Sequence, residues 1–477
     1  MSTSNATTST VEPKPPSGFR TALRYTGIPV SWLDKRPKLP SRNWLIFLSI
    51  TSSITGYFIY DRRECRRIKQ HYIDLVKEQA DEPVDALAWP RKVTVYGAKW
   101  PGDEDYEQAI KYFRKYVKPI LVAAAVDFEL ISGKRFGDVA HRVAEDIRKR
   151  RRIDLGIDPI PDIAKALPTY KPPEEVAKHT LQGGIVIVGR PTLKEFMAGL
   201  RKGWTDPLDN VDNEEVLARE LESDAHFDEP EEPSDDPSES SVPKLSVPSA
   251  RNSPVFSPLQ IRSPSTHAKT ISSIPDAMNV PPLTIPPVPP LLLVPFTNHI
   301  GFSQIPIMIW EWFNRRHKVR AGAEAGYRLV TNCSRPIIPP MEEPQPMFAD
   351  IITSQAKASQ GDLDFDTEAE WWYKSSLSKL TSEIEKARNK YYDSLPAKLA
   401  TARELARGVR EPTKEELNNP PPTEVELRAE RMKKELRWRH DVAGWDIVNP
   451  QQKVVWDDRF RDALRIFTDR DGEASSL

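Results

Sequence analysis

The sequence GGIVIVGRPTLKEFMAGLRKGW, residues 183–204, holds a strand, a turn and a helix in one short stretch. The β-branched run 185–188 predicts a buried strand. Gly189 marks a turn, and Thr192 with Glu195 three residues later forms a capping box, which predicts the start of a helix. That helix carries apolar residues at helical spacing, namely Leu193, Phe196, Met197 and Leu200. The stretch therefore predicts one βα unit of a parallel sheet.

Two further units of the same kind precede it. The run 93–96 predicts a strand, and the apolar run 120–126, continued through 127–130, predicts a strand buried on both faces. A helix with an apolar face follows each strand, and Pro119 closes the first of these helices. The faces consist of Tyr106, Ala109, Ile110, Phe113 and Val117 in the first helix and of Val139, Ala140, Val143, Ala144 and Ile147 in the second. Three such units predict an α/β domain with a mainly parallel sheet over residues 91–204.

The turns near Gly97 and Gly189 would lie at the carboxyl edge of this sheet, where α/β proteins commonly bind ligands. A membrane-anchored α/β enzyme or nucleotide-binding protein is therefore one hypothesis. Its chemistry is missing, because neither a phosphate-binding glycine motif nor a nucleophile or metal-ligand motif can be written from the sequence. The two cysteines, Cys65 and Cys333, give no zinc or multi-disulfide pattern. We therefore expect no catalytic residues, no cofactor and no metal.

A second feature is the uncharged stretch NWLIFLSITSSITGYFIY, residues 43–60, in a chain whose mean hydropathy is -0.54. As a helix it would be roughly 27 Å long, close to the bilayer core of about 30 Å, and it predicts a single transmembrane helix. On the grounds of its length, the alternative is a buried helix of a soluble domain. Five hydroxyl residues also make the stretch only marginally apolar. These residues are Ser49, Thr51, Ser52, Ser53 and Thr55.

Small residues within this stretch indicate a helix-packing face. Ser49 with Ser53, and Ser52 with Gly56, lie four residues apart, which is the spacing that lets transmembrane helices approach closely. We therefore expect another membrane protein to pack there. Cations flank both ends of the stretch and can reach lipid headgroups. These flanking residues are Lys35, Arg36 and Arg42 before it and Arg62, Arg63, Arg66 and Arg67 after it.

The tail before the predicted span, residues 1–42, carries seven Lys or Arg against Glu12 and Asp34. The positive-inside rule places this basic tail on the matrix or cytoplasm side and the bulk of the chain across the membrane. The whole chain has 68 basic and 69 acidic side chains, a net charge of -1, so no global field attracts nucleic acid. We expect no nucleic-acid partner.

The composition changes abruptly after the α/β region. Residues 206–239 contain fifteen acidic side chains and one basic, and residues 230–290 contain fifteen prolines. Such a segment cannot bury enough apolar surface to offset its ordering entropy. Residues 205–290 are therefore predicted to be a disordered linker.

Order is expected to return near residue 291. The apolar first part of PIMIWEWFNRRHKVRAGAEAGYRLV, residues 306–330, would add a strand or helix to the same core. Residues 367–392 and 424–439 are predicted to be helices, and their tryptophans are interpreted mainly as core residues. The acidic run DLDFD, residues 362–366, could bind Mg²⁺ but is more typical of a helix start.

Several extended stretches resemble one known family. They are GIPVSWLDKRPKLPSRNWLIFLS, VTVYGAKWPGD, DFELISGKRFGDVAHRVAEDIRKRRR and GGIVIVGRPTLKEFMAGLRKGW. Together they are similar to the fungal mitochondrial import inner-membrane translocase subunit of about 54 kilodaltons. The similarity covers residues 18–204 and returns around 305–330, whereas the acidic and proline-rich interval has no counterpart that we identify.

The resemblance implies a non-catalytic subunit of the translocase that inserts multi-spanning carrier proteins into the mitochondrial inner membrane. It also implies a single-pass topology with the N-terminus in the matrix and a large domain in the intermembrane space. The implied partners are the channel-forming subunit, the small intermembrane-space chaperone complexes and the lipid bilayer. Members of this family are further linked to assembly of an inner-membrane AAA protease, which makes that protease a further implied partner and an assembly factor for it an alternative function.

These observations give one predicted layout. The chain is predicted to be a scaffold and docking platform. It begins with an N-terminal transmembrane helix, which is followed by an α/β domain with a disordered insertion and a helical C-terminal part. The predicted segments are 1–42 for the basic tail, 43–60 for the span, 61–90 for a connector, 91–204 and 291–400 for the folded domain, 205–290 for the linker and 401–477 for the helical C-terminal region.

Overall fold

The computed structural model describes residues 41–80, 89–158, 170–208, 213–228, 274, 279–340 and 361–469. The chain divides into two compact units, residues 1–62 and 63–477. Most of the basic tail, with Lys35 and Arg36, and residues 229–273 of the predicted linker lie outside the described residues.

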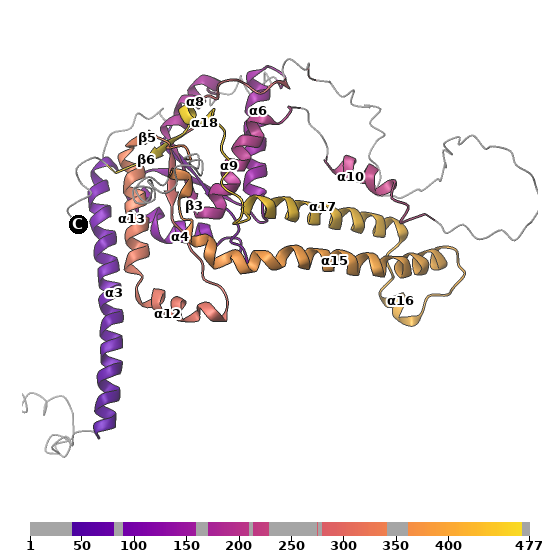
Figure 1. Cartoon of the computed structure of the whole chain (residues 1–477), viewed down its shortest axis with the longest axis horizontal. Coiled ribbons are helices and arrows are strands. Elements are labelled where there is room, and N and C mark those ends of the chain that lie inside the picture. Colours follow the sequence, from indigo (N-terminus) through magenta and orange to yellow (C-terminus); the bar gives the residue numbers. More distant parts are fainter. Residues whose placement is uncertain are drawn as a thin grey trace, which may run out of the picture. The chain divides into compact units, whose positions relative to one another are not determined.

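The second unit is built on a six-stranded sheet with the order β2-β1-β3-β4-β6-β5 (Figure 1). All neighbouring strands are parallel except β5 and β6, which are antiparallel. The predicted mixed α/β class with a mainly parallel sheet is therefore confirmed. The strands are β1 (Lys92–Gly97), β2 (Asp127–Ser132), β3 (Gly184–Val188), β4 (Leu291–Val294), β5 (Ser334–Pro336) and β6 (Arg465–Phe467).

Strand β3 shows how the sequence builds the core. All five of its residues are buried, as expected for a continuous apolar run covered on both faces. Val186 and Val188 join one apolar cluster, with α4 (Gln108–Tyr116), α5 (Lys118–Ala123) and α13 (Arg316–Thr331). Ile185 and Ile187 join the other, with α6 (Asp138–Asp154) and α9 (Arg190–Thr205). The two-residue period of the strand thus supplies both sides of the sheet.

The strand predicted from residue 120 is wrong in its first half, and its second half, β2, is an edge strand without a buried residue rather than a strand buried on both faces. Residues 118–123 form α5, with Pro119 in its first turn, where a fixed φ and a missing N–H cost nothing. Ala125 then adopts a left-handed conformation, with φ of 56°, and ends the helical segment. Strand β2 begins only at Asp127, opposite Lys92 of β1. The apolar run was ambiguous because a buried helix and a buried strand have the same composition.

The capping box predicted at Thr192 and Glu195 is also wrong. Helix α9 already begins at Arg190 after Gly189, which has a positive φ of 82°. Thr192 Oγ1 accepts from the Ala98 N–H at 2.9 Å and donates to the Val188 carbonyl at 2.6 Å, so it links two strand ends. A capping box does form at Thr423, where α17 (Glu424–Val448) begins.

Residues 43–60 lie in the single helix α3 (Arg42–Ala80). Its C-terminal half packs into the core of the second unit through Ile68, Tyr72 and Val76, and Tyr72 contacts Tyr327 of α13 with ring centroids 6.0 Å apart. Among the described residues, no helix is both long enough and apolar enough to span a bilayer. The predicted span fails on apolarity, because the hydroxyl residues of 43–60 dilute its Ile, Leu and Phe.

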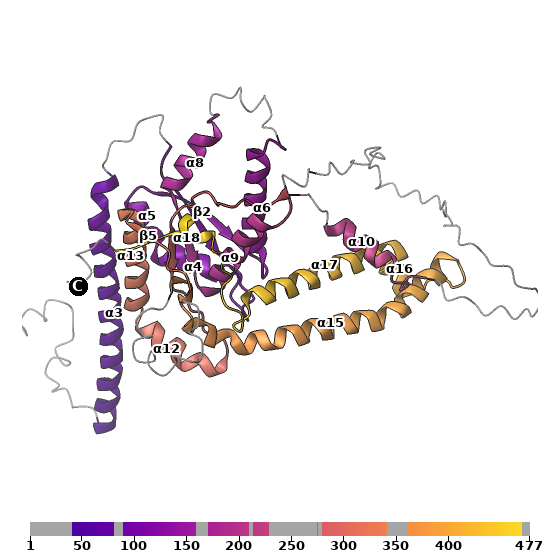
Figure 2. The same ribbon diagram turned by 45° about the horizontal axis from the view of Figure 1, so that its top comes forward.

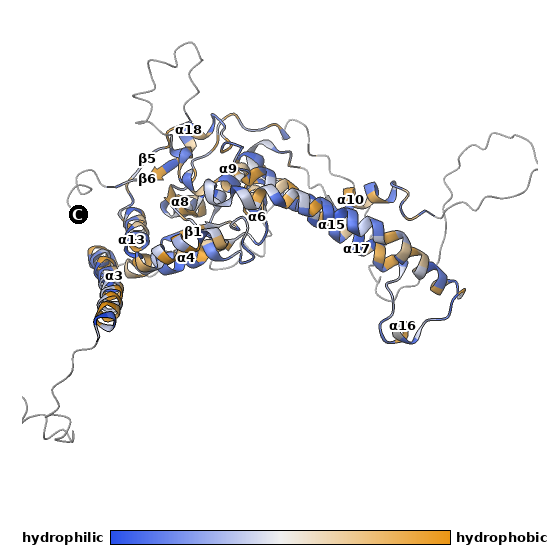
Figure 3. Cartoon of the chain, turned by 60° about the horizontal axis from the view of Figure 1, so that its bottom comes forward, coloured by the Kyte–Doolittle hydropathy of each residue, from blue (hydrophilic) through white to orange (hydrophobic). Residues whose placement is uncertain are grey.

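The C-terminal helices are longer than predicted. The predicted helix 367–392 is α15 (Glu368–Ala406), which continues past Pro396, and the predicted helix 424–439 is α17. The two helices pack side by side and form an arm, and the short α16 (Lys414–Asn418) lies in the connection at the end of the arm (Figures 1 and 3). Trp371 of α15 is exposed rather than part of the core.

The rest of the C-terminal region is not purely helical, since α18 (Phe460–Ala463) leads into β6 and this strand joins the sheet. Such a three-residue strand gives too weak a period to be recognised from sequence. Within the interval predicted to be disordered, the structure places α10 (Asn213–Glu222), which lies beside α17 (Figure 2). The remaining described elements are α8 (Pro173–Gln182), η1 (Phe302–Gln304), α12 (Ile305–Phe313) and η4 (Asp362–Asp364).

Helix α12 corrects another prediction. Residues 306–313 were expected to join the core, yet none of the residues of α12 is buried. The core positions at this side of the sheet are taken by α13, α4 and α5. An apolar sequence alone does not state whether its surface faces the protein.

Candidate functional site

The carboxyl edge of the sheet is filled by the chain itself. Gly97 ends β1, and a Cβ placed there would lie 2.8 Å from the Ile110 side chain. Beyond it, Trp100 is 2% exposed and packs edge-on against Phe296 and Tyr373, with ring centroids 5.4 and 5.2 Å away. The turns that the sequence offered as a ligand site are therefore occupied by aromatic side chains.

Next to these rings lies a buried ion cluster. Arg190 Nε donates to Glu370 Oε1 at 2.8 Å, and Lys194 Nζ lies 2.7 Å from the same oxygen. Arg190 also donates to the Phe365 carbonyl and Lys194 to the Asn449 carbonyl. Burial lowers the pKa of Lys194, and the contact with Glu370 opposes that shift. The cluster fixes α9 to the start of α15 and to the end of α17.

The acidic run 362–366 belongs to the same filled edge. Asp362 binds Arg335 with two hydrogen bonds of 2.7 and 2.6 Å. Asp366 accepts from the Phe296 N–H, and burial raises its pKa to about 6. In the part of the chain that the structure describes, no group of three or more His, Cys, Asp or Glu is placed to hold a metal ion. These aspartates therefore act as structural ties around η4.

Glu195 serves a neighbouring helix instead of its own. Its side chain is fully buried, and its Oε2 accepts from the Val139 N–H in the first turn of α6 at 3.1 Å. Burial raises the pKa of Glu195 to about 8, against the lowering effect of the backbone N–H groups of Gly137, Val139 and Ala140. The carboxyl group thus caps α6 and joins it to α9.

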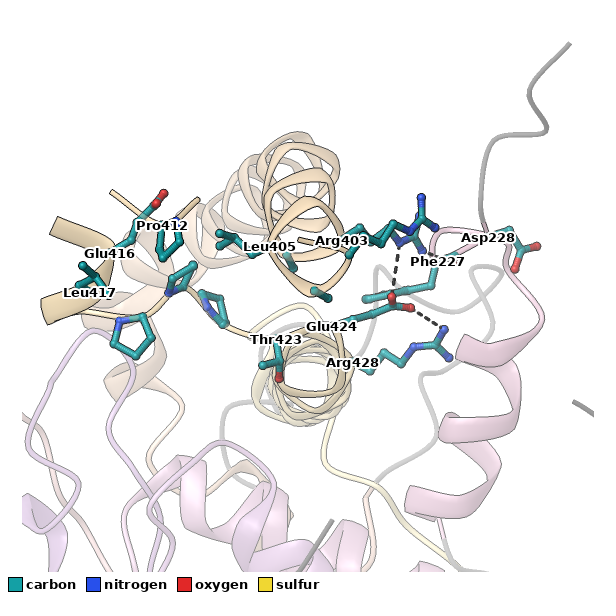
Figure 4. A pocket seen from close by; sticks show the side chains of 16 residues that line it. Phe227, Asp228, Arg403, Leu405, Pro412, Glu416, Leu417, Thr423, Glu424 and Arg428 are labelled. Atoms are coloured by element: carbon teal, nitrogen blue, oxygen red, sulfur yellow. Dashed lines mark hydrogen bonds and ion pairs between the residues drawn. The ribbon is translucent and has the colours of Figure 1, made fainter. Parts of the chain in front are cut away.

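An open cavity of about 750 Å³ lies at the far end of the arm (Figure 4). Its wall is apolar along Leu405 and the three prolines 420–422, and polar where Arg403 and Arg428 approach Glu424. Glu424 accepts from Arg403 at 3.4 Å and from Arg428 at 2.9 Å. Apolar walls with a few fixed charges are the chemistry of sites that take organic ligands or segments of polypeptide.

A network of charged side chains joins the helices of the arm near this cavity. Glu435 of α17 is fully buried and accepts from Arg388 at 3.0 and 3.1 Å and from the Tyr392 hydroxyl at 2.7 Å, both on α15. Arg431, 2% exposed, pairs with Asp224 after α10. Three segments distant in sequence are thereby held together, so the cavity is supported by a rigid frame.

The residues predicted from the sequence lie elsewhere. Ser49, Ser52, Ser53 and Gly56 are exposed on α3, and a Cβ at Gly56 would meet no atom within 4 Å. Among the flanking cations, Arg42, Arg63, Arg66 and Arg67 are also exposed on α3, whereas Arg62 is half-buried.

Sequence reasoning missed both the buried cluster and the cavity. Arg190 and Lys194 flank the apolar residue Leu193 in a helix that the apolar spacing predicted to face the core, which was the available signal for the cluster. The cavity left no signal, because its lining comes from segments as far apart as Phe227 and Arg428.

The fold and its surfaces define an α/β protein with a filled sheet edge, a two-helix arm and exposed apolar helix surface. Residues 20–395 match the family described as "Inner membrane protein import complex subunit Tim54". The chain belongs to this family.

Similar proteins carry the same description. A "Mitochondrial import inner membrane translocase subunit TIM54" of Cryptococcus neoformans var. neoformans is 36% identical over 454 residues, which is 94% of each chain. The protein of that name from Candida albicans is 31% identical over 371 residues, 69% of this chain and 87% of the relative. The one from Aspergillus oryzae is 40% identical over 177 residues, 36% of this chain and 40% of the relative. The chain is accordingly a subunit of the mitochondrial inner-membrane import translocase.

Proposed function

We propose that this subunit acts without catalysis, as a scaffold that docks other components of the translocase. The observation that carries the proposal is the contrast between two places in the second unit. The sheet edge where an α/β enzyme would bind its substrate is closed by Trp100, Tyr373 and the Arg190–Glu370–Lys194 cluster. An open cavity with apolar and charged walls lies at the end of the arm instead.

The arm suits a docking role for a physical reason. The two long helices extend away from the sheet, and the contacts of Glu435 with Arg388 and of Arg431 with the Tyr392 hydroxyl hold α17 against α15. A rigid site loses little conformational entropy when a partner binds. We propose that the small intermembrane-space chaperone complexes bind at this end. Holding them at the membrane raises the effective concentration of carrier precursor near the channel-forming subunit.

The same proposal assigns an orientation. Residues 63–477 would lie in the intermembrane space, on the side of the inner membrane where the small chaperone complexes are found. The exposed apolar half of α3 would contact the inner membrane together with a partner helix, because Ile46, Ile50 and Ile54 are exposed and Gly56 leaves room for close approach. The channel-forming subunit is the partner that we propose for this face, and an inner-membrane AAA protease is a further client of the same tether.

Site-specific photo-cross-linking in isolated mitochondria tests the docking site. A cross-linking amino acid is placed at Leu417, which is 68% exposed and lines the cavity, and at Val425, which is 65% exposed on α17 and does not line it. We expect adducts with small intermembrane-space proteins from Leu417 and not from Val425. Equal adducts from both positions, or none from Leu417, would contradict docking at the cavity.

A matched pair of variants tests the consequence for import. Leu417→Asp should reduce carrier insertion, and Val425→Asp should leave insertion unchanged, because both side chains are exposed and neither supports the fold. Normal insertion with Leu417→Asp would remove the cavity from the mechanism. Protease treatment before and after rupture of the outer membrane tests the orientation, since a C-terminal tag should be lost only after rupture.

A further inference from the structure

Helix α12 is apolar except for Glu311, yet none of its residues is buried. Its residues Ile305, Met308, Ile309 and Trp312 recur at the spacing of one helix face. All four are exposed, by 41%, 44%, 53% and 46% respectively. A surface helix normally turns such a face toward the core. This face points away from the protein.

The acidic side chain of α12 points to the protein instead. Glu311 is half-buried, and its carboxylate accepts from Lys318 Nζ at 2.8 Å and lies 3.1 Å from His299 Nε2. His299 in turn packs edge-on against Trp372, with ring centroids 4.6 Å apart. These contacts fix the rotation of α12, so the outward apolar face follows from the fold.

The exposed surface around α12 has the composition of a membrane interface. Phe302, just before the helix, is 93% exposed, and Trp310 is 68% exposed. Trp is enriched where a protein meets the headgroup layer, because its ring is apolar and its N–H is polar. Residues 301–320 contain Arg315, Arg316 and Arg320 in addition to Lys318, which pairs with Glu311, the single acid of this segment. Such a local excess of cations complements anionic lipid headgroups.

We propose that α12 lies flat in the headgroup layer of a lipid bilayer and forms a membrane contact separate from α3. The occupant of the apolar face is lipid rather than a second protein. Three observations favour lipid: the two exposed tryptophans, the adjacent cations and the membership of the chain in an inner-membrane family. A helix of nine residues is about 14 Å long and cannot cross a bilayer, which leaves an interfacial position.

The test uses the full chain reconstituted in vesicles of phosphatidylcholine and phosphatidylglycerol. In a background with Cys65→Ser and Cys333→Ser, one fluorescent probe is attached through Met308→Cys and, as a control, through Val425→Cys, which is exposed on the arm. Lipids that carry a quencher near the headgroup should quench the Met308 probe several-fold more than the Val425 probe. Lipids with the quencher near the chain end should quench it less. Quenching at Met308 no greater than at Val425 would overturn the proposal.

A second variant separates α12 from α3. Ile309→Glu with Trp312→Glu places two charges on the apolar face without touching the core, because both residues are exposed. The Met308 probe should then lose its quenching, while a probe attached through Ile50→Cys on α3 should keep its own. Unchanged quenching at Met308 in the double variant would contradict insertion of the apolar face. Loss at both positions would show that the two membrane contacts are not separate, which would also overturn the proposal.

Discussion

Helices α9 and α12 reverse the usual relation between hydropathy and burial. Helix α9 contains Arg190, Lys194 and Glu195, and it buries all three. Helix α12 is nearly all apolar between Ile305 and Phe313, and it buries none of its residues. The difference teaches that burial follows the partners that the fold supplies. The polar side chains of α9 find partners in the Glu370 carboxylate, in backbone carbonyls and in the N–H groups of α6. The side of the core beside α12 is instead filled by α13.

The partners of the buried charges in α9 should be energetically essential. Glu370→Ala leaves Arg190 and Lys194 facing each other without their shared carboxylate. Removing one partner of a buried pair typically costs about 3–5 kcal/mol, and we expect a loss near the lower figure, about 3 kcal/mol. Urea unfolding of the purified chain measures it. Glu385→Ala, an exposed acid later in α15, is the control and should change the free energy of unfolding little.

The next largest effect on the free energy of unfolding is expected where α9 packs against α6. A Cβ at Gly199 would lie 2.5 Å from the Ala140 carbonyl oxygen, which is backbone and cannot rotate away. Gly199→Ala should therefore destabilise the chain by about 2 kcal/mol despite the better helix propensity of alanine. Gly56→Ala is the matched control, since it has free space on α3. A stabilised Gly199→Ala variant in thermal unfolding would show that the two helices are not in close contact.

Glu195 predicts a dependence of stability on pH. Its pKa is about 8 in the folded chain and near 4.5 in the unfolded chain, so between these values the folded state holds a proton that the unfolded state has released. The contribution to stability is complete below pH 4.5 and is lost as the pH rises through 8. The slope is at most about 1.4 kcal/mol per pH unit. Glu195→Gln should remove this slope and keep the cap on α6. An unchanged slope between pH 5 and 8 would show that Glu195 is not its source.

The smallest effect is expected on α12. Trp310→Ser removes a large side chain that is 68% exposed, so the free energy of unfolding in solution should change by less than about 0.5 kcal/mol. Chemical denaturation of the two proteins side by side measures this. A loss of several kcal/mol would mean that Trp310 is packed against the protein, and the comparison with α9 would then fail.

Much of the fold could be predicted from the sequence, because the pattern of a strand or helix is visible within a few neighbouring residues. The runs 93–96 and 185–188 gave β1 and β3, and the apolar spacing after each gave α4 and α9. Residues 120–126 do not form the predicted strand, because composition does not separate a buried helix from a buried strand and Pro119 favours the first turn of a helix. Thr192 and Glu195 matched a local capping pattern, yet both side chains bond to other elements.

By itself the sequence determined the α/β class, the order of its main helices and strands and the family, since these depend on local periodicity and on extended similarity. Tertiary structure alone decided what each surface does. It closed the sheet edge with Tyr373 and Glu370, brought Phe227 to Arg428 at the end of the arm, and turned the apolar face of α12 outward. The physical reason is that side-chain contacts across more than a hundred residues depend on how the elements pack, and no local pattern records that packing.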